Sequence, residues 1–156
     1  MKVAPTLMGG LKIEAEVPGD WEVLRWIVND ATAGEVDLAA RLAGRMPDEE
    51  LARDWEAFVV PDLRAEFSDQ VATVGRAIEE AVAANGGGPG ALHVPPTDIL
   101  GWFGALNQAR LGLEERFCFE QDPRPNLVKM NSVRRSGFLR GRFYAAVQEI
   151  MLTHLM

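Results

Sequence analysis

The stretch WFGALNQARLGLEERF, residues 102–117, is the most strongly patterned part of the chain. Its apolar residues recur at the three- and four-residue spacing of one helix face, and the pattern begins just before it: Ile99, Trp102, Phe103, Leu106, Leu113 and Phe117. Pro95 and Pro96 cannot lie inside a helix, so they mark its start. We therefore predict a core helix over about 97–118 that the other segments cover.

Segments on both sides of this helix have patterns of their own. Alternation from Leu11 to Val17 behind Gly9-Gly10 predicts a β-hairpin over about 2–17. Helical periodicity covers about 20–84, a Gly-rich linker is expected at 85–96, and a C-terminal helix at about 136–155. The predicted fold is mainly α: a helical bundle of five or six helices with a small N-terminal β-hairpin.

Size and composition place the chain among ordinary globular proteins. Its 156 residues suit a single domain, 1–156, and its hydrophobic content is 47% with 25% charged residues. No apolar run approaches the roughly 20 residues that cross a membrane, and the N-terminus does not resemble a secretory signal. A single cysteine, Cys118, rules out an internal disulfide. We expect a cytoplasmic protein that has no membrane partner.

Charge is unevenly distributed along this acidic chain, whose net charge is -7. Residues 123–148 contain six basic residues and no acidic one, among them Arg134, Arg135, Arg140 and Arg142. These arginines either dock onto the acidic body or are solvated, which is the usual fate of such runs, or they contact an anion or a protein partner. Nucleic acid is not an expected partner, because the rest of the chain is strongly acidic.

Signatures of common catalytic and metal sites are missing from the sequence. Two distant histidines and one cysteine are too few for a usual zinc site. The glycines at 86–90 lack the ending of a phosphate-binding loop, and no serine lies in a nucleophile elbow. We therefore name no catalytic residue, no metal ligand and no cofactor.

One line of polar residues remains of interest. Asn107, Arg110 and Glu114 share a helix side beside the apolar stripe. Arg110 could be tied to a carboxylate inside the chain, with Glu149 of the closing helix as first candidate. Alternatively, Trp102, Asn107 and Arg110, with Glu149 nearby, surround a small polar pocket in which Arg110 receives an anionic ligand or a partner's carboxylate.

The residues Trp102, Ala105-Leu106-Asn107 and Arg110-Leu111 resemble a bacterial family known as domain of unknown function 2017, which is common in actinobacteria. Residues 144–155, with Gln148-Glu149 at their centre, are similar to that family's closing helix. The basic run 134–142 departs from the family pattern, which is acidic there. The family has no established activity. The genes that neighbour its actinobacterial members imply a link to proteolysis, and no catalytic residues carry over.

Two function classes follow from these observations. The first is a non-enzymatic interaction or regulatory protein with an unknown protein partner or self-association, linked to proteolysis by the resemblance alone. It fits the missing catalytic constellation, the helical architecture and the uneven charge. The second is an enzyme or small-anion binder whose pocket lies around Trp102, Asn107 and Arg110.

Overall fold

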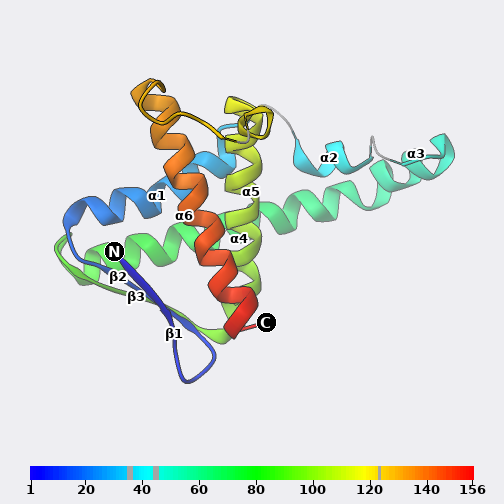
Figure 1. Cartoon of the computed structure of the whole chain (residues 1–156). Helices are drawn as coiled ribbons and strands as arrows, with labels where there is room; N and C mark the ends of the chain where they lie inside the picture. Colours follow the sequence, from blue (N-terminus) through cyan, green and yellow to red (C-terminus); the bar gives the residue numbers. More distant parts are fainter. Residues whose placement is uncertain (35–36, 44–45, 123) are drawn as a thin grey trace.

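A three-stranded antiparallel sheet covers one side of the helices (Figure 1). In this computed structural model, which describes residues 1–34, 37–43, 46–122 and 124–156, strand β1 is Lys2–Pro5 and β2 is Leu11–Ala15. The two pair as the predicted hairpin, with Val3 opposite Ile13. Every second residue of β2 is buried, which confirms that one face of this strand packs on the core.

The expected linker at 85–96 is wrong for half of its length, because Gly90–Val94 forms strand β3. This strand pairs with the free edge of β2, with Leu92 opposite Ile13. Leu92 and Val94 are buried on either side of an exposed His93. That alternation is the signal of a half-buried strand, and the four glycines at 86–88 and 90 concealed the signal. Residues 85–89 and Pro95 remain connections.

Six helices account for most of the residues that the structure describes. α1 is Pro18–Thr32, α2 Leu38–Ala43, α3 Glu49–Phe58, α4 Val60–Ala84, α5 Ile99–Phe117 and α6 Ser132–His154, with short 3-10 turns η1 at Pro96–Asp98 and η2 at Phe119–Gln121. Residues 35, 36, 44 and 45 of the expected helical stretch lie outside the described residues. α6 begins four residues earlier than predicted because the Asn131 side chain accepts a hydrogen bond from the backbone N–H of Arg134 at 2.8 Å.

α5 is the central helix, as the sequence predicts, and α1, α4 and α6 all pack against it. Trp102, Leu106 and Leu113 are at most 1% exposed. Gly112 permits the close approach of α1, because a Cβ atom there would lie 2.1 Å from the backbone oxygen of Asp30. Helix α1 is thereby held against α5 at its C-terminal end.

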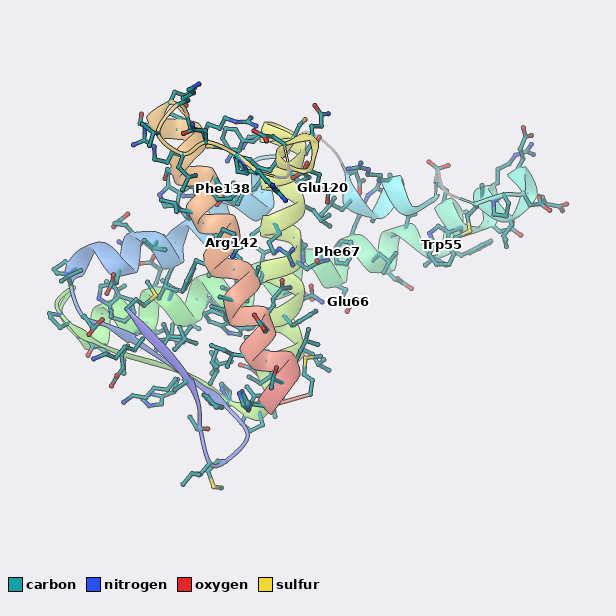
Figure 2. All side chains as sticks on the ribbon, viewed as in Figure 1. Trp55, Glu66, Phe67, Glu120, Phe138 and Arg142 are labelled. Atoms are coloured by element: carbon teal, nitrogen blue, oxygen red, sulfur yellow. The ribbon has the colours of Figure 1, made fainter. Side chains whose placement is uncertain are left out.

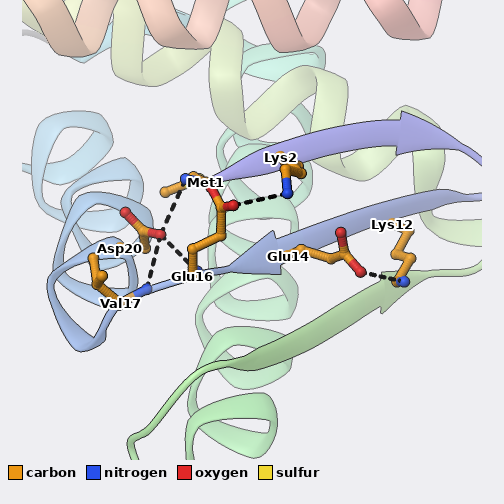
Figure 3. A network of polar contacts seen from close by, with 7 residues as sticks. All are labelled: Met1, Lys2, Lys12, Glu14, Glu16, Val17 and Asp20. Atoms are coloured by element: carbon orange, nitrogen blue, oxygen red, sulfur yellow. Dashed lines mark hydrogen bonds and ion pairs between the residues drawn. The ribbon is translucent and has the colours of Figure 1, made fainter.

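The start of the chain is pinned by an ionic network between the sheet and α1 (Figure 3). The amino group of Met1 lies 2.7 Å from Oε2 of Glu16 and 3.2 Å from Oδ2 of Asp20, while Nζ of Lys2 lies 2.9 Å from Oε1 of Glu16. These cations, Lys2 first, lower the pKa of Glu16 to about 2. The network fixes β1 on the sheet edge.

A second, smaller apolar cluster lies apart from the main core. Figure 1 shows α2, α3 and the beginning of α4 extending away from the other helices, and we call α2, α3 and residues 60–67 the arm. Ala39 and Val60 are buried there, with Trp55, Leu63 and Phe67 packed around them. Across the described ranges, no helix has the combination of length and apolar character needed to span a membrane.

Candidate functional site

A buried carboxylate joins three helices at the centre of the protein. The side chain of Asp30, near the end of α1, is fully buried. Its Oδ2 accepts a hydrogen bond from Nε of Arg140 at 2.6 Å, and its Oδ1 accepts one from Nη2 at 2.9 Å. Arg140 donates its third bond to Oγ of Ser136, and its guanidinium stacks 4.2 Å from the Trp26 ring centre. This bidentate pair fastens α6 to α1.

Two more side chains donate hydrogen bonds to the carboxylate of Asp30. Nη2 of Arg116 on α5 donates to Oδ1 at 3.0 Å, and the hydroxyl of Tyr144 on α6 donates to Oδ2 at 2.8 Å. Burial, and then the negative charge of Asp30, raise the pKa of Tyr144, so the phenol stays protonated. Both oxygens of Asp30 are occupied. We therefore interpret this cluster as a clamp on α1, α5 and α6 rather than as a proton acceptor for a substrate.

Asp30 is not among the sequence-predicted site residues, although a signal for it is present in the sequence. Asp30 follows Ile27 by three residues and Leu24 by six, so it belongs to the buried face of α1. An acidic residue on that face requires a cation on a neighbouring helix. The basic run near α6 contains that cation, and the two observations were not combined because they are 110 residues apart.

Arg110 does not pair with Glu149, so that prediction is wrong. Nη1 of Arg110 donates to Oε1 of Gln148 at 2.8 Å, and Nε2 of Gln148 donates to the carbonyl of Phe103 at 3.1 Å. Gln148 is 3% exposed, whereas Glu149 lies on the exposed side of α6. Successive residues on a helix differ by about 100° in direction, so the Glu149 carboxylate is turned away from α5. The partner of Arg110 is a neutral amide.

Trp102, Asn107 and Arg110 do not surround one pocket as expected. Trp102 is in the core, Arg110 faces α6, and Asn107 is exposed on the side of α5 toward the arm. There Asn107 lines a groove of about 640 Å³. The groove lies between α2, α4, α5 and η2, and Figure 2 labels Phe67 and Glu120 of its lining. Neither Trp102 nor Arg110 belongs to that lining.

The four arginines of the basic segment have different environments. Arg140 binds Asp30, and Arg134 donates to the carbonyl of Phe117 while its guanidinium lies 5.0 Å from the Phe119 ring centre. Arg135 donates to the carbonyl of Met130 at 2.8 Å and keeps an exposed side chain. Arg142 is exposed on α6 (Figure 2). Half of the segment thus docks internally, as one of the two sequence interpretations expected.

Residues with nucleophilic or metal-binding side chains lie apart from one another. Cys118 is exposed and adopts a left-handed conformation with φ of 49° at the end of α5. His93 is on β3, and His154 closes α6. Within the ranges that the structure describes, no three His, Cys, Asp or Glu side chains are grouped closely enough to hold a metal ion.

Comparison with models of known protein families identifies the family of this chain. A family model described as domain of unknown function (DUF2017) matches residues 8–155. The chain belongs to the DUF2017 family. No curated protein matches it, and no solved structure matches it either.

The DUF2017 match confirms the resemblance seen in the residues of α5 and α6. It also extends from the turn before β2 to the end of α6, so it includes the Asp30 clamp, the arm and the groove. The family description carries no activity, and the function of this DUF2017 protein has to be argued from its own surfaces.

Proposed function

We propose that this DUF2017 protein is a non-enzymatic interaction protein whose arm binds a protein partner. The observation that carries the proposal is that α3 has no buried residue. A ten-residue helix is barely stable alone in water, and most helices in proteins depend on tertiary packing. Among the described residues, α3 has its main contacts with α2 and α4, so a partner that covers it would provide the burial that its own chain lacks.

Apolar side chains on the arm favour the same conclusion. Phe58 is 74% exposed and Leu51 is 50% exposed, although α3 is amphipathic. Exposed aromatic residues on a protruding element are typical anchors of protein interfaces. The Nε1–H of Trp55, labelled on the arm in Figure 2, is buried without an acceptor among the described residues. An incoming chain could supply that acceptor.

The charge of α3 indicates the kind of partner surface. Glu49, Glu50, Asp54 and Glu56 outnumber the single basic residue, Arg53. Complementary charge guides association and suppresses wrong partners. We therefore expect a partner that presents an apolar depression with a basic rim. The family resemblance suggests that components of a proteolytic system be examined first.

The alternative of an enzyme or anion binder around Trp102, Asn107 and Arg110 has less support. Such a site needs a cation that is free to meet an anion. Arg110 instead donates to Gln148, and Trp102 is 1% exposed. Trp102 therefore lies in the core, while Arg110 contacts α6 and Asn107 lines the groove.

The test compares three forms of the protein as bait in extract from its native host. One carries Leu51→Ser and Phe58→Ser, one is unchanged, and the matched control carries Leu100→Ser on α5, where the side chain is 67% exposed. Quantitative mass spectrometry should find a partner retained by the unchanged protein and the control and lost with the arm variant. Circular dichroism verifies that all three forms are folded. Equal retention of every captured protein by the three forms would refute the role of the arm.

A further inference from the structure

The groove is lined by apolar residues together with several acidic ones. Leu38 of α2, Phe67 of α4 and Leu111 of α5 supply apolar lining, and Leu111 is 40% exposed. The charged residues of the lining are Arg41, Glu114, Glu115 and Glu120. Their formal charges leave the groove negative. A ligand that fits it combines apolar side chains with cations.

Gln108 contributes a side-chain amide to the lining of the groove. Gln108 is 6% exposed, and its Nε2 donates to Oε1 of Gln70 at 2.9 Å and to the carbonyl of Phe67 at 3.3 Å. Its Oε1 accepts no hydrogen bond from the described residues. Because Gln108 lines the groove, this amide oxygen can accept a hydrogen bond from an incoming N–H, such as that of a peptide backbone.

The complementary surface is present in the same chain. Residues 124–135 join η2 to the first turn of α6, and in this segment Val128 is 87% exposed and Val133 68% exposed. The cations Arg124, Lys129 and Arg135 are exposed beside them. This segment therefore has the apolar and positive character that the groove requires, and its own groove does not cover it.

Both surfaces lie at one end of the molecule. Glu120 and Gln121 of η2 line the groove, and the chain then crosses from the end of α5 to the start of α6 (Figure 1). Neighbouring complementary surfaces permit a two-fold pair in which each copy offers its segment to the other's groove. We propose that the occupant of the groove is the 124–135 segment of a second copy, exchanged reciprocally in a dimer. The groove shares Leu38, Arg41 and Phe67 with the arm, so the test below changes only residues of α5, η2 and the 124–135 segment, which lie outside the arm.

The proposal does not rest on net charge, which is -7 for each copy and opposes association at long range. Salt screens that repulsion and also weakens the local ion pairs, so salt dependence alone cannot test it. Reversing charges at the two surfaces separates the effects, because it changes the local pairing in a predictable direction.

The experiment measures dimer dissociation of the full chain by sedimentation velocity. A groove variant carries Glu115→Lys and Glu120→Lys, and a segment variant carries Arg124→Glu and Lys129→Glu. Each alone should raise the dissociation constant at least roughly tenfold, because like charges then face each other. In an equimolar mixture both contacts regain opposite charges, so the mixed dimer should return to the wild-type range.

Controls that reverse one charge of each sign elsewhere are Glu80→Lys on α4 and Arg142→Glu on α6, both exposed. They should leave the dissociation constant unchanged. A wild-type protein that stays monomeric at high concentration overturns the proposal. So do variants that dimerise as the wild type does, or a mixture that dimerises no better than its components. Recovery in the mixture also shows that the two variants are folded.

Discussion

Asp30→Ala should be among the most damaging substitutions in this protein. The change removes a fully buried carboxylate that accepts four hydrogen bonds, two from Arg140, one from Arg116 and one from Tyr144. Arg140 is 8% exposed, so its guanidinium would remain desolvated without its counter-ion. Breaking a buried pair in this way costs about 3–5 kcal/mol, which is a large part of the stability of a typical domain.

The free energy of unfolding can be measured by urea denaturation at pH 7, followed by circular dichroism. The matched control is Asp69→Ala on the exposed side of α4, expected to change stability by less than about 0.5 kcal/mol. Tyr144→Phe is a milder test of the same cluster, because it removes one hydrogen bond to Asp30. It should cost about 1.5–3 kcal/mol, the usual range for a hydrogen bond to a charged group.

A double-mutant cycle isolates the ionic pair from the packing. Arg140→Leu removes the cation and keeps apolar contact with the Trp26 ring, 4.2 Å away. The double variant with Asp30→Ala should be less destabilised than the sum of the two single variants, because neither partner is left charged and unpaired. A loss below about 1 kcal/mol for Asp30→Ala, or strictly additive losses, would refute the description of the cluster as a clamp.

Two further predictions concern exposed parts of the fold. Arg110→Ala should lower the free energy of unfolding by less than about 1 kcal/mol in urea denaturation, since its partner is neutral and the arginine is exposed. In double variants, this loss of stability should be non-additive with that of Gln148→Ala and additive with that of Glu149→Ala. The opposite pattern would support the Arg110–Glu149 ion pair that the sequence predicts. The pKa of Glu16 is about 2 in the folded protein and 4.5 without the cations, so its contribution to stability is present above pH 4.5 and declines as the pH falls toward 2. Wild type should therefore be more stable than Glu16→Gln at pH 7, with a gap that narrows between pH 4.5 and pH 3, and a constant gap would contradict the ionic network.

Much of the fold could be predicted because its signals are local. The apolar stripe of α5, the hairpin and the long α4 follow from spacing within a single segment. Strand β3 was missed because its five residues lie between glycines and prolines, and its pairing with β2 is a long-range contact. Sequence spacing gives the face of a residue but not the partner opposite it.

The candidate site residues depend even more on contacts between segments that are distant in the sequence. Glu149 was chosen for Arg110 by charge type, whereas the rotation of α6 brings Gln148 to that position. Asp30 lies on a predicted inner face, but its two arginines come from α5 and α6. The groove is built from four separate elements, and no single stretch of sequence contains its pattern. Such sites depend on tertiary geometry, which periodicity does not supply.

The length of α4 has a structural consequence. Its 25 residues extend over about 37 Å as one continuous helix, with Val60 in the arm and Val71, Val74 and Ile78 in the main core. The helix therefore joins the apolar cluster of the arm to the main core without a break. Phe67 lies on α4 between these two groups of residues, where it lines the groove. A partner that binds the arm would therefore contact a helix whose Phe67 also lines the groove beside α5.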